Sequence, residues 1–290
     1  MTPIRRSDTG WTEYRKACLV FVYRSFLFVP GARFDRFGKA VAAGADAVII
    51  DLEDAVLPVD KAQARTDTLT WLGAWRGRHL GLRINSPRTA FGCADLAALA
   101  GSAAATRADF LVIPKAETAV DLEIVAEALG RKIPLIPIIE SGRALANAFE
   151  IAKQATGGVL FGGVDFSASL GADLSDWDAM LTARGTIAAA CGSGGVPAYD
   201  VPFLDTADTD GLTTSTRKAK AMGFSGRACI HPGQVAAVNA VYTPSAEEIA
   251  DARAVLAAMD AAGGGVALHK GKMIDRPVIL AAERLLASVR

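Results

Sequence analysis

The sequence predicts an α/β protein built on a (β/α)8 barrel, the TIM-barrel fold, followed by a C-terminal helical segment that acts as a lid. Short apolar runs rich in β-branched residues recur eight times between residues 25 and 230, and most are separated by stretches with helical periodicity. Strands that alternate with helices pair in parallel, and eight units over about 210 residues fit a closed barrel better than a six-stranded open sheet.

The predicted elements follow in order along the chain. The strands are 25–29, 47–52, 80–84, 110–114, 135–139, 159–161, 198–203 and 228–230. The helices are 33–43, 61–75, 119–129, 143–154, 178–190 and 209–222. A doubly wound sheet would carry a Gly-rich phosphate loop after an early strand, and the sequence has neither a G-x-G-x-x-G nor a Walker A pattern.

After the eighth unit, "TPSAEEIADARAVLAAMDAA" predicts an amphipathic helix in which Ser245 is the N-cap and Glu248 completes a capping box. The glycines at 263–265 predict a hinge and a mobile tail. We therefore expect an N-terminal extension at 1–23, a catalytic barrel at 24–243 and a helical lid at 244–290. Residues 1–23 match none of the predicted barrel units. An extra strand, an N-terminal arm and a misassigned start of the chain are the alternatives for this segment.

Composition excludes several classes of function. The 290 residues are 51% apolar and 21% charged, with 31 basic and 31 acidic residues. A net charge of zero gives no electrostatic reason to bind nucleic acid or an anionic membrane. The early apolar run at 17–23 is too short to span a bilayer. Four widely spaced cysteines without a C-x-x-C pair indicate neither zinc nor a disulfide framework, so we expect a reduced, cytoplasmic protein.

Polar residues at the strand ends are the candidates for chemistry, because a barrel of this kind carries its active site at the C-terminal ends of its strands. The predicted strands two to six are followed by several such residues. They are Glu53 and Asp54, Arg83 and Asn85, Lys115 and Glu117, Glu140, and Asp165 after the glycine pair of "LFGGVD". Paired glycines after a strand allow another group to approach the backbone closely.

Glu140 and Asp165 are expected on adjacent strands that face one crevice. Two bare carboxylates about 4 Å apart repel by roughly 4 kcal/mol at an effective dielectric constant of 20. One acid can stay protonated, Arg83 and Lys115 can pair with them, or a divalent cation can bind both. Oxygen-only ligands favour Mg²⁺ over Zn²⁺. A purely structural ion pair remains an alternative.

Six motifs, in order from residue 24 to residue 277, resemble the citrate lyase β-subunit-like group of the HpcH/HpaI superfamily, which includes malyl-CoA and citramalyl-CoA lyases. They are "RSFLFVPGARFDRF", "GADAVIIDLEDAV", "LRIN", "IPIIES", "LFGGVDFSASLG" and "GKMIDRP". The resemblance implies that Glu140 and Asp165 ligate Mg²⁺. It also implies that the backbone amides of Gly163, Val164 and Asp165 hold the substrate carboxylate.

The resemblance assigns further roles at the barrel mouth. Arg83 corresponds to an arginine that stabilises the oxygen which alternates between alkoxide and carbonyl, although it could also merely pair with Glu53. The related aldolases carry a catalytic His after this Glu, whereas Asp54 follows it here. This difference argues against the aldolase branch and leaves Glu53 to bind a metal-bound water or Lys115, or to serve the structure alone.

The C-terminal motif "GKMID" resembles one whose aspartate reaches a neighbouring subunit and exchanges a proton with the acyl carbon. That residue is Asp275 here, and the resemblance implies a homo-oligomer, a trimer or a hexamer. The family receives CoA phosphates near the first unit, where four basic residues are expected to help: Arg24, Arg33, Arg36 and Lys39. His231, which precedes Pro232, is expected to be structural.

The resemblance therefore implies a Mg²⁺-dependent carbon–carbon lyase that cleaves malyl-CoA, citramalyl-CoA, citryl-CoA or a similar β-hydroxyacyl-CoA to a 2-oxo acid and an acyl-CoA. Thioester hydrolysis on the same scaffold is one alternative. Another is a β subunit that acts only within a citrate lyase complex on an acyl-carrier-protein-bound substrate, or a binding protein with vestigial chemistry. A Schiff-base aldolase that uses Lys115 is the last.

Overall fold

The computed structural model describes residues 22–77, 79–262 and 267–289. The chain divides into two compact units, the barrel unit up to Asn239 and the C-terminal unit from Ala240. The division lies within helix α11 (Val235–Tyr242), slightly before the boundary expected at residue 243. The extension expected at 1–23 lies almost entirely outside the described residues, as does the glycine hinge at 263–265.

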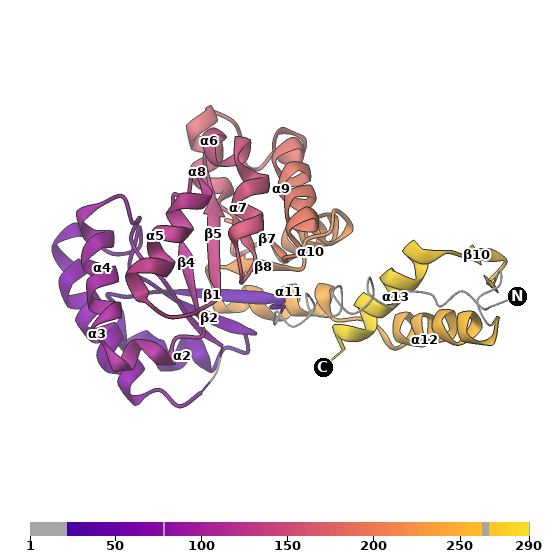
Figure 1. Ribbon diagram of the computed structural model, residues 1–290, viewed down its shortest axis with the longest axis horizontal. Helices are drawn as coiled ribbons and strands as arrows, with labels where there is room; N and C mark the ends of the chain where they lie inside the picture. The colour runs from indigo at the N-terminus through magenta and orange to yellow at the C-terminus, as the bar shows by residue number, and fades with distance from the viewer. Residues whose placement is uncertain (1–21, 78, 263–266, 290) are drawn as a thin grey trace, which may run out of the picture. The chain divides into compact units, whose positions relative to one another are not determined.

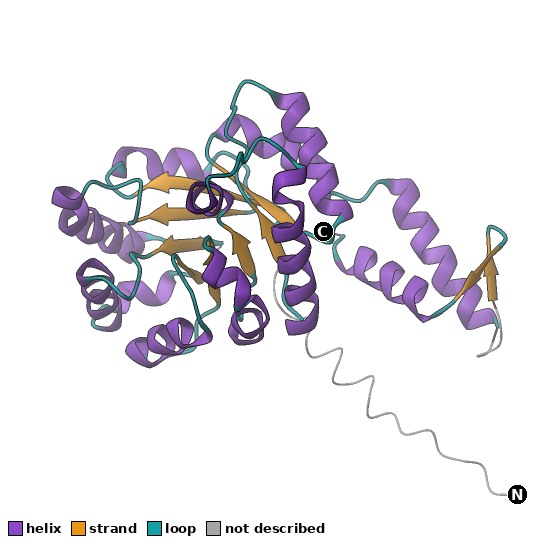
Figure 2. Cartoon of the chain, turned by 90° about the horizontal axis from the view of Figure 1, so that it is seen from above, coloured by secondary structure: helices purple, strands orange, loops and turns teal. Residues whose placement is uncertain are grey.

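Eight parallel strands of the described chain close into a barrel in the order in which they occur, and β1 pairs with β8 to complete it. They are β1 (Ser25–Pro30), β2 (Ala47–Asp51), β3 (Leu80–Arg83), β4 (Phe110–Ile113), β5 (Leu135–Ile139), β6 (Val159–Phe161), β7 (Ala198–Asp200) and β8 (Gly226–Cys229). The strands lie at the centre of the unit and the helices lie around them (Figures 1 and 2). The predicted (β/α)8 barrel is confirmed.

Helices connect successive strands. The predicted ones are present as α2 (Phe37–Val41), α3 (Lys61–Ala74), α5 (Ala119–Leu129), α6 (Gly142–Ala146) with α7 (Ala148–Gln154), α9 (Leu181–Gly194) and α10 (Thr209–Ala221). Short 3-10 turns are present at Phe34–Arg36, Pro58–Asp60, Ala103–Arg107, Asp178–Met180 and Pro232–Gln234. The sequence did not predict α4 (Ala90–Ala100), α8 (Gly163–Leu170) or α11. Helix α4 is rich in alanine without a broad polar face, the first residues of α8 continue a glycine-rich turn, and α11 is short.

Two strands differ from their predicted bounds by two residues or more, while the others match within one residue at each end. The strand expected at 198–203 ends at Asp200, because Pro202 has no N–H to donate and restricts the backbone of the residue before it. Strand β8 begins at Gly226 rather than residue 228. A Cβ at Gly226 would lie 2.1 Å from the Tyr23 carbonyl oxygen, so glycine allows the chain before β1 to pass close to β8.

Aromatic side chains fill the barrel interior toward the N-terminal ends of the strands. The Phe26 ring contacts the Tyr199 ring with centroids 4.6 Å apart and the Phe110 ring at 5.6 Å, and Tyr23 adds a contact to Phe110 at 5.3 Å. Strands β2, β4 and β5 are buried along their whole length, as expected when helices cover a parallel sheet. This packing leaves the polar side chains to gather at the opposite, C-terminal end.

The C-terminal unit has its own small core. Helix α12 (Ala246–Ala261), the hairpin of β9 (Ala267–His269) and β10 (Lys272–Ile274), and α13 (Arg276–Ala287) bury Val255, Ile274 and Ala282 together. The predicted capping box is present: Ser245 Oγ accepts the Glu248 N–H, and Glu248 Oε2 accepts the Ser245 N–H. In both units, no described helix is long and apolar enough to cross a bilayer.

Candidate active site

An ion pair joins the C-terminal ends of β2 and β3. Asp51 and Arg83 are register partners in the parallel ladder. Arg83 Nε donates to Asp51 Oδ1 at 2.7 Å, and the second guanidinium nitrogen Nη2 donates to Asp51 Oδ2 at 2.6 Å. Asp51 is only 2% exposed. A bidentate pair of this kind fixes the plane of the guanidinium, so the remaining nitrogen, Nη1, has a defined direction.

Glu53 is held between two cations. Arg83 Nη1 lies 3.0 Å from Glu53 Oε2, and Lys115 Nζ donates to Glu53 Oε1. Burial raises the pKa of Glu53, while the charges of Arg83 and Lys115 oppose that rise. Both contacts considered from the sequence, to Arg83 and to Lys115, are therefore present at the same carboxylate.

Hydrogen bonds from neighbouring side chains fix the backbone that carries Glu53. Asp51 Oδ1 accepts the Glu53 N–H at 2.9 Å. Buried Lys61 donates from Nζ to the carbonyl oxygens of Leu52 and Glu53, both at 2.9 Å. Asn85 Nδ2 donates to the Leu52 carbonyl as well. Four hydrogen bonds made by three residues thus fix the backbone of the turn after β2 that carries Glu53.

Lys115 follows β4 and connects the two acidic groups of the site. Its backbone lies in the left-handed region, with φ 53°, which is uncommon for a non-glycine residue. Burial lowers the pKa of Lys115, but the hydrogen bond to Glu53 and the surrounding carboxylates outweigh that effect, and the net pKa is raised. The amine is therefore a cation, which is a poor starting point for Schiff-base chemistry.

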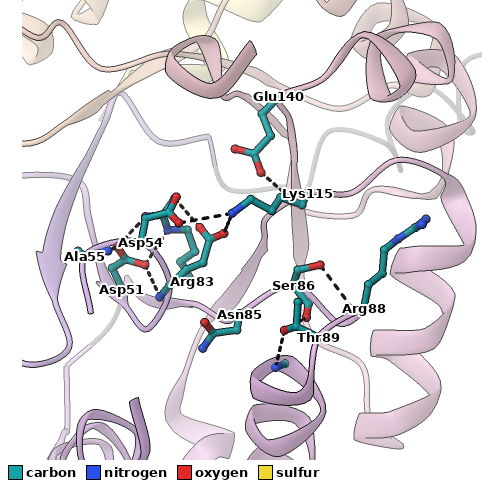
Figure 3. A network of polar contacts seen from close by, with 12 residues as sticks. Asp51, Asp54, Ala55, Arg83, Asn85, Ser86, Arg88, Thr89, Lys115 and Glu140 are labelled. Carbon is teal, nitrogen blue, oxygen red and sulfur yellow. Dashed lines mark hydrogen bonds and ion pairs between the residues drawn. The ribbon is translucent and has the colours of Figure 1, made fainter. Parts of the chain in front are cut away.

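Glu140 follows β5 and is 5% exposed. Its Oε1 accepts the Lys115 backbone N–H, and Figure 3 shows the Glu140 carboxylate directed at that backbone while the Lys115 side chain extends toward Asp54. Burial, followed by the negative charge of Glu53, raises the pKa of Glu140 to about 8, and the charge of Asp165 adds to the rise. The positive charges near Glu140 therefore do not offset its burial and the two neighbouring negative charges.

Gly162 provides the space beside Glu140. A Cβ at residue 162 would lie 2.5 Å from Glu140 Cβ and 2.8 Å from Glu140 Oε2. Real Cβ atoms do not approach other atoms so closely, so any side chain here would displace the carboxylate. The glycine that follows β6 therefore lets Glu140 keep its position.

Helix α8 begins directly after Gly162. The Phe166 N–H donates to the Gly162 carbonyl at 3.0 Å, so Gly163, Val164 and Asp165 supply amides that precede the first intrahelical bond. Such an N-terminus attracts anions. Asp165 itself lies in this first turn with an exposed side chain. The amides predicted to hold a carboxylate are therefore those of a helix N-terminus, which the sequence had not predicted.

The two acids fit a hard cation. Glu140 is buried with an excess of negative charge near it, and Asp165 acts on it electrostatically. Both offer only oxygen, the ligand atom that Mg²⁺ prefers. The described part of the chain contains no group of three or more His, Cys, Asp or Glu side chains arranged to hold a metal. Two carboxylates would leave most coordination positions to substrate and water.

The predicted CoA-binding residues do not lie together. Arg24 precedes β1, whereas Arg33 follows it, so the two residues lie at opposite ends of the barrel. Arg24 forms an ion pair with Asp46, Nη2 to Oδ1 at 2.7 Å. The prediction that Arg24 faces the mouth is wrong, because a residue before a strand lies at its N-terminal end. Arg33 pairs with Asp35 on the surface after the C-terminal end of β1, and exposed Arg36 and Lys39 follow it along the chain.

Two other residues are placed as caps. Asp275, in the C-terminal unit, is the N-cap of α13, and its Oδ1 accepts the Val278 N–H at 3.2 Å. His231 Nδ1 accepts the Gly233 N–H, and Gln234 completes the capping box, so His231 has the structural position expected of it.

Sequence reasoning missed Asp51 as a member of the site. It is the last residue of an apolar strand, and the more conspicuous Glu53 and Asp54 follow it. Its position directly before the turn at the C-terminal end of β2 was the available signal.

Comparisons with known proteins match most of the chain to one family. The family model described as HpcH/HpaI aldolase/citrate lyase matches residues 24–232, and a model of carbon–carbon bond lyases of the TIM-barrel fold matches residues 196–287. An L-malyl-CoA/beta-methylmalyl-CoA lyase of Cereibacter sphaeroides is 36% identical, over 90% of this chain and 92% of the relative. A citrate lyase subunit beta-like protein of Mycobacterium tuberculosis is 39% identical, over 90% and 93%.

A solved structure extends the likeness to three dimensions. The protein CitE from Mycobacterium tuberculosis, in complex with magnesium, acetoacetate and coenzyme A, matches with a TM-score of 0.77 and 35% identity, over 93% of this chain and 99% of that one. With the closed barrel and the strand-end acids in place, these matches lead to one conclusion. The chain belongs to the HpcH/HpaI aldolase/citrate lyase family.

Proposed function

We propose that the protein is a Mg²⁺-dependent carbon–carbon lyase that cleaves a β-hydroxyacyl-CoA, such as malyl-CoA, citramalyl-CoA or citryl-CoA, to a 2-oxo acid and an acyl-CoA. The observation that carries the proposal is the arrangement of Glu140, Asp165 and Arg83 at the C-terminal end of the barrel. The names of the relatives, malyl-CoA lyase and citrate lyase subunit beta-like protein, support this class of substrate.

Glu140 and Asp165 are the proposed Mg²⁺ ligands. When bound, the ion would supply positive charge to the substrate oxygens and offset the repulsion between the two acids. The first turn of α8 would hold the substrate carboxylate through the amides of Gly163, Val164 and Asp165. The magnesium complex of the related CitE protein supports the choice of metal.

Arg83 would stabilise the oxygen that changes from hydroxyl to carbonyl. Asp51 fixes its guanidinium plane, and a donor held in place before the reaction stabilises developing charge at little reorganisation cost. Glu53 would complete this arrangement by holding Nη1 of Arg83 and the Lys115 ammonium. We place Glu53 beside the reacting atoms as a positioning group or as a partner of bound water.

In the cleavage direction the substrate hydroxyl loses its proton, and the bond between its carbon and the acyl α-carbon breaks. The electron pair passes to the thioester as an enolate, and Asp275 gives a proton to the carbon. The hydroxyl proton passes through water held beside Glu53 to solvent, and Asp275 takes from solvent the proton that it delivers, so one proton leaves oxygen, one arrives on carbon, and the step balances. In reverse, Asp275 would take a proton from the acyl-CoA.

Asp275 is proposed to act in a neighbouring subunit of a homotrimer or hexamer. A mixing experiment tests this. Arg83→Lys and Asp275→Asn proteins, each impaired alone, are denatured, mixed and refolded together. Hybrid oligomers that regain activity would support action in trans, and a mixture no more active than its parts would refute it. Light scattering gives the subunit number.

Arg33, Arg36 and Lys39 are proposed to approach the CoA phosphates, because they follow β1 at the active end of the barrel. A cytoplasmic location is also proposed. It rests on free thiols at Cys93, Cys191 and Cys229, since an oxidising compartment favours disulfides.

A two-product assay tests the function. Purified protein is incubated with malyl-CoA, with Mg²⁺ or EDTA, while glyoxylate and free thiol are followed. Glyoxylate without free thiol identifies a lyase, whereas free thiol with malate identifies a thioesterase and refutes the proposal. Activity only on acyl-carrier-protein thioesters would indicate a citrate lyase subunit instead, an alternative supported by the name of one relative.

A further inference from the structure

Lys115 is the residue that contacts both acids of the proposed site, by two different groups. Its backbone N–H donates to Glu140 Oε1, and its side-chain ammonium donates to Glu53 Oε1. The same ammonium lies 3.4 Å from Asp54 Oδ1. Lys115 takes no part in the bond changes of the proposed reaction, although it is positioned between Glu140, a proposed Mg²⁺ ligand, and the turn after β2.

The backbone conformation of Lys115 makes the contact with Glu140 possible. With φ 53°, the residue turns its N–H toward Glu140 immediately after the end of β4. A side chain in this region is strained by about 1–3 kcal/mol, and such strain is found where the surroundings over-determine the conformation, often at functional sites. Here the amide engages Oε1, while Oε2 lies on the Gly162 side, next to α8.

The ammonium has a different task. Four carboxylates in this cluster, those of Asp51, Glu53, Asp54 and Glu140, interact with Arg83 or Lys115, and Lys61 is a third cation but is buried. The Arg83 side chain is 14% exposed, whereas that of Lys115 is 48% exposed. The lysine thus provides the more accessible positive charge of the cluster, and an anionic substrate would meet it before it met Arg83.

We propose that Lys115 is a positioning residue with two separable functions: its left-handed backbone amide fixes Glu140 so that Oε2 is available to the cation, and its ammonium fixes Glu53 and favours entry of the anionic substrate. The inference rests on the proposed lyase function and names a residue on which that function depends. The two functions respond differently to substitution, because side-chain charge and backbone conformation can be changed separately.

Three variants separate the two functions. Lys115→Met removes the charge and keeps a flexible side chain, Lys115→Gly removes the charge and favours positive φ, and Lys115→Val removes the charge and disfavours positive φ. Lys153→Met, on the exposed surface of α7, is the matched control for loss of a lysine charge. Mg²⁺ affinity is measured by calorimetry at pH 8.5. KM and kcat are measured with malyl-CoA, and thermal unfolding shows whether each variant is folded.

We expect Lys115→Met and Lys115→Gly to bind Mg²⁺ no more weakly than the wild type, because loss of a cation makes the site more negative. Lys115→Val should bind Mg²⁺ at least tenfold more weakly than Lys115→Met. All three should raise KM at least tenfold, since all lose the ammonium. The control should match the wild type in each measurement.

Equal Mg²⁺ affinity in Lys115→Val and Lys115→Met would overturn the backbone function. An unchanged KM in Lys115→Met would overturn the ammonium function. If Lys115 had only a structural role, Mg²⁺ affinity would fall in step with the unfolding temperature in all variants, which would also contradict the proposal.

If Lys115→Val does not fold, the comparison of Lys115→Gly with Lys115→Met still decides, because weaker Mg²⁺ binding by Lys115→Gly than by Lys115→Met would contradict the proposal. A wild-type protein without lyase activity would instead refute the proposed function and leave the calorimetric comparison intact.

Discussion

Arg83 and Asp51 are joined by two parallel hydrogen bonds, of 2.7 and 2.6 Å, across adjacent parallel strands at the C-terminal end of the barrel. This pair uses two of the three guanidinium nitrogens and directs the third at Glu53. The planar fork, and not only the positive charge, therefore determines the geometry of the site.

Arg83→Lys should lower kcat about 10²–10³-fold, the usual effect of losing a preorganised donor, because a lysine cannot hold Asp51 and also face the substrate. Mg²⁺ affinity should change little, since Arg83 contacts neither proposed ligand. Steady-state kinetics and calorimetry on the same preparation check both statements. Arg65→Lys, a conservative change at the ion pair with Asp95, is the control and should keep kcat. Full kcat in the Arg83→Lys enzyme would contradict the role of the fork.

Gly162→Ala should abolish Mg²⁺ binding and activity, because the new Cβ would meet Glu140 Cβ at 2.5 Å and Oε2 at 2.8 Å. Gly185→Ala is the matched control. It lies within α9 with nothing within 4 Å of its added Cβ, so it should leave activity intact and add up to about 1 kcal/mol of stability. Calorimetry of both variants makes the test, and Mg²⁺ binding by Gly162→Ala at wild-type affinity would contradict the packing argument.

The pKa of Glu140, raised from 4.5 to about 8 chiefly by burial, predicts how the stability of the metal-free protein depends on pH. A raised carboxyl pKa means that the folded state binds the proton more tightly than the unfolded chain. Stability therefore falls as pH rises from about 4.5 to about 8. Glu140→Gln removes this contribution.

Urea unfolding in EDTA at pH 5, 6.5 and 8.5 measures the effect. The wild type should lose more stability across this range than Glu140→Gln, and added Mg²⁺ should stabilise the wild type most at pH 8.5, where no proton competes for the carboxylate. Identical pH profiles for the two proteins would show that Glu140 does not titrate in this range.

Asp275 caps α13, so its two possible functions can be separated. Asn is as good an N-cap as Asp, whereas Ala is not. Asp275→Asn should keep the unfolding temperature and lower kcat about 10²–10⁴-fold, the usual contribution of a general acid or base. Asp275→Ala should lose the same activity and also about 1 kcal/mol of stability. Full kcat in the Asp275→Asn protein would show that Asp275 only caps α13 and takes no part in proton transfer.

The fold was predictable because local pattern and topology agree. Apolar strands between amphipathic helices at regular spacing allow few architectures, and α5 begins and ends at the predicted residues, 119 and 129. Helix α8 was missed because its first residues, Gly163 and Val164, continue a glycine-rich turn after β6. The capping box at Ser245 was predictable because it is a local pattern, in which Ser245 and Glu248 each accept the other's backbone N–H.

The positions of the candidate site residues were predictable where a charged residue stands at or shortly after the C-terminal end of a predicted strand. Glu53, Arg83, Glu140 and Asp165 are of this kind. The error at Arg24 came from counting a residue before β1 with residues after it. The left-handed backbone of Lys115 could not be predicted, because nothing about a lysine signals positive φ and its partners lie on other strands.

Calorimetric titration of Mg²⁺ into the wild type, Glu140→Gln and Asp165→Asn tests the central claim most directly. We predict one binding event per chain in the wild type and none measurable in either variant, with unfolding temperatures in EDTA that remain close to one another. Mg²⁺ binding that survives either substitution, or no binding by the wild type, would contradict the account.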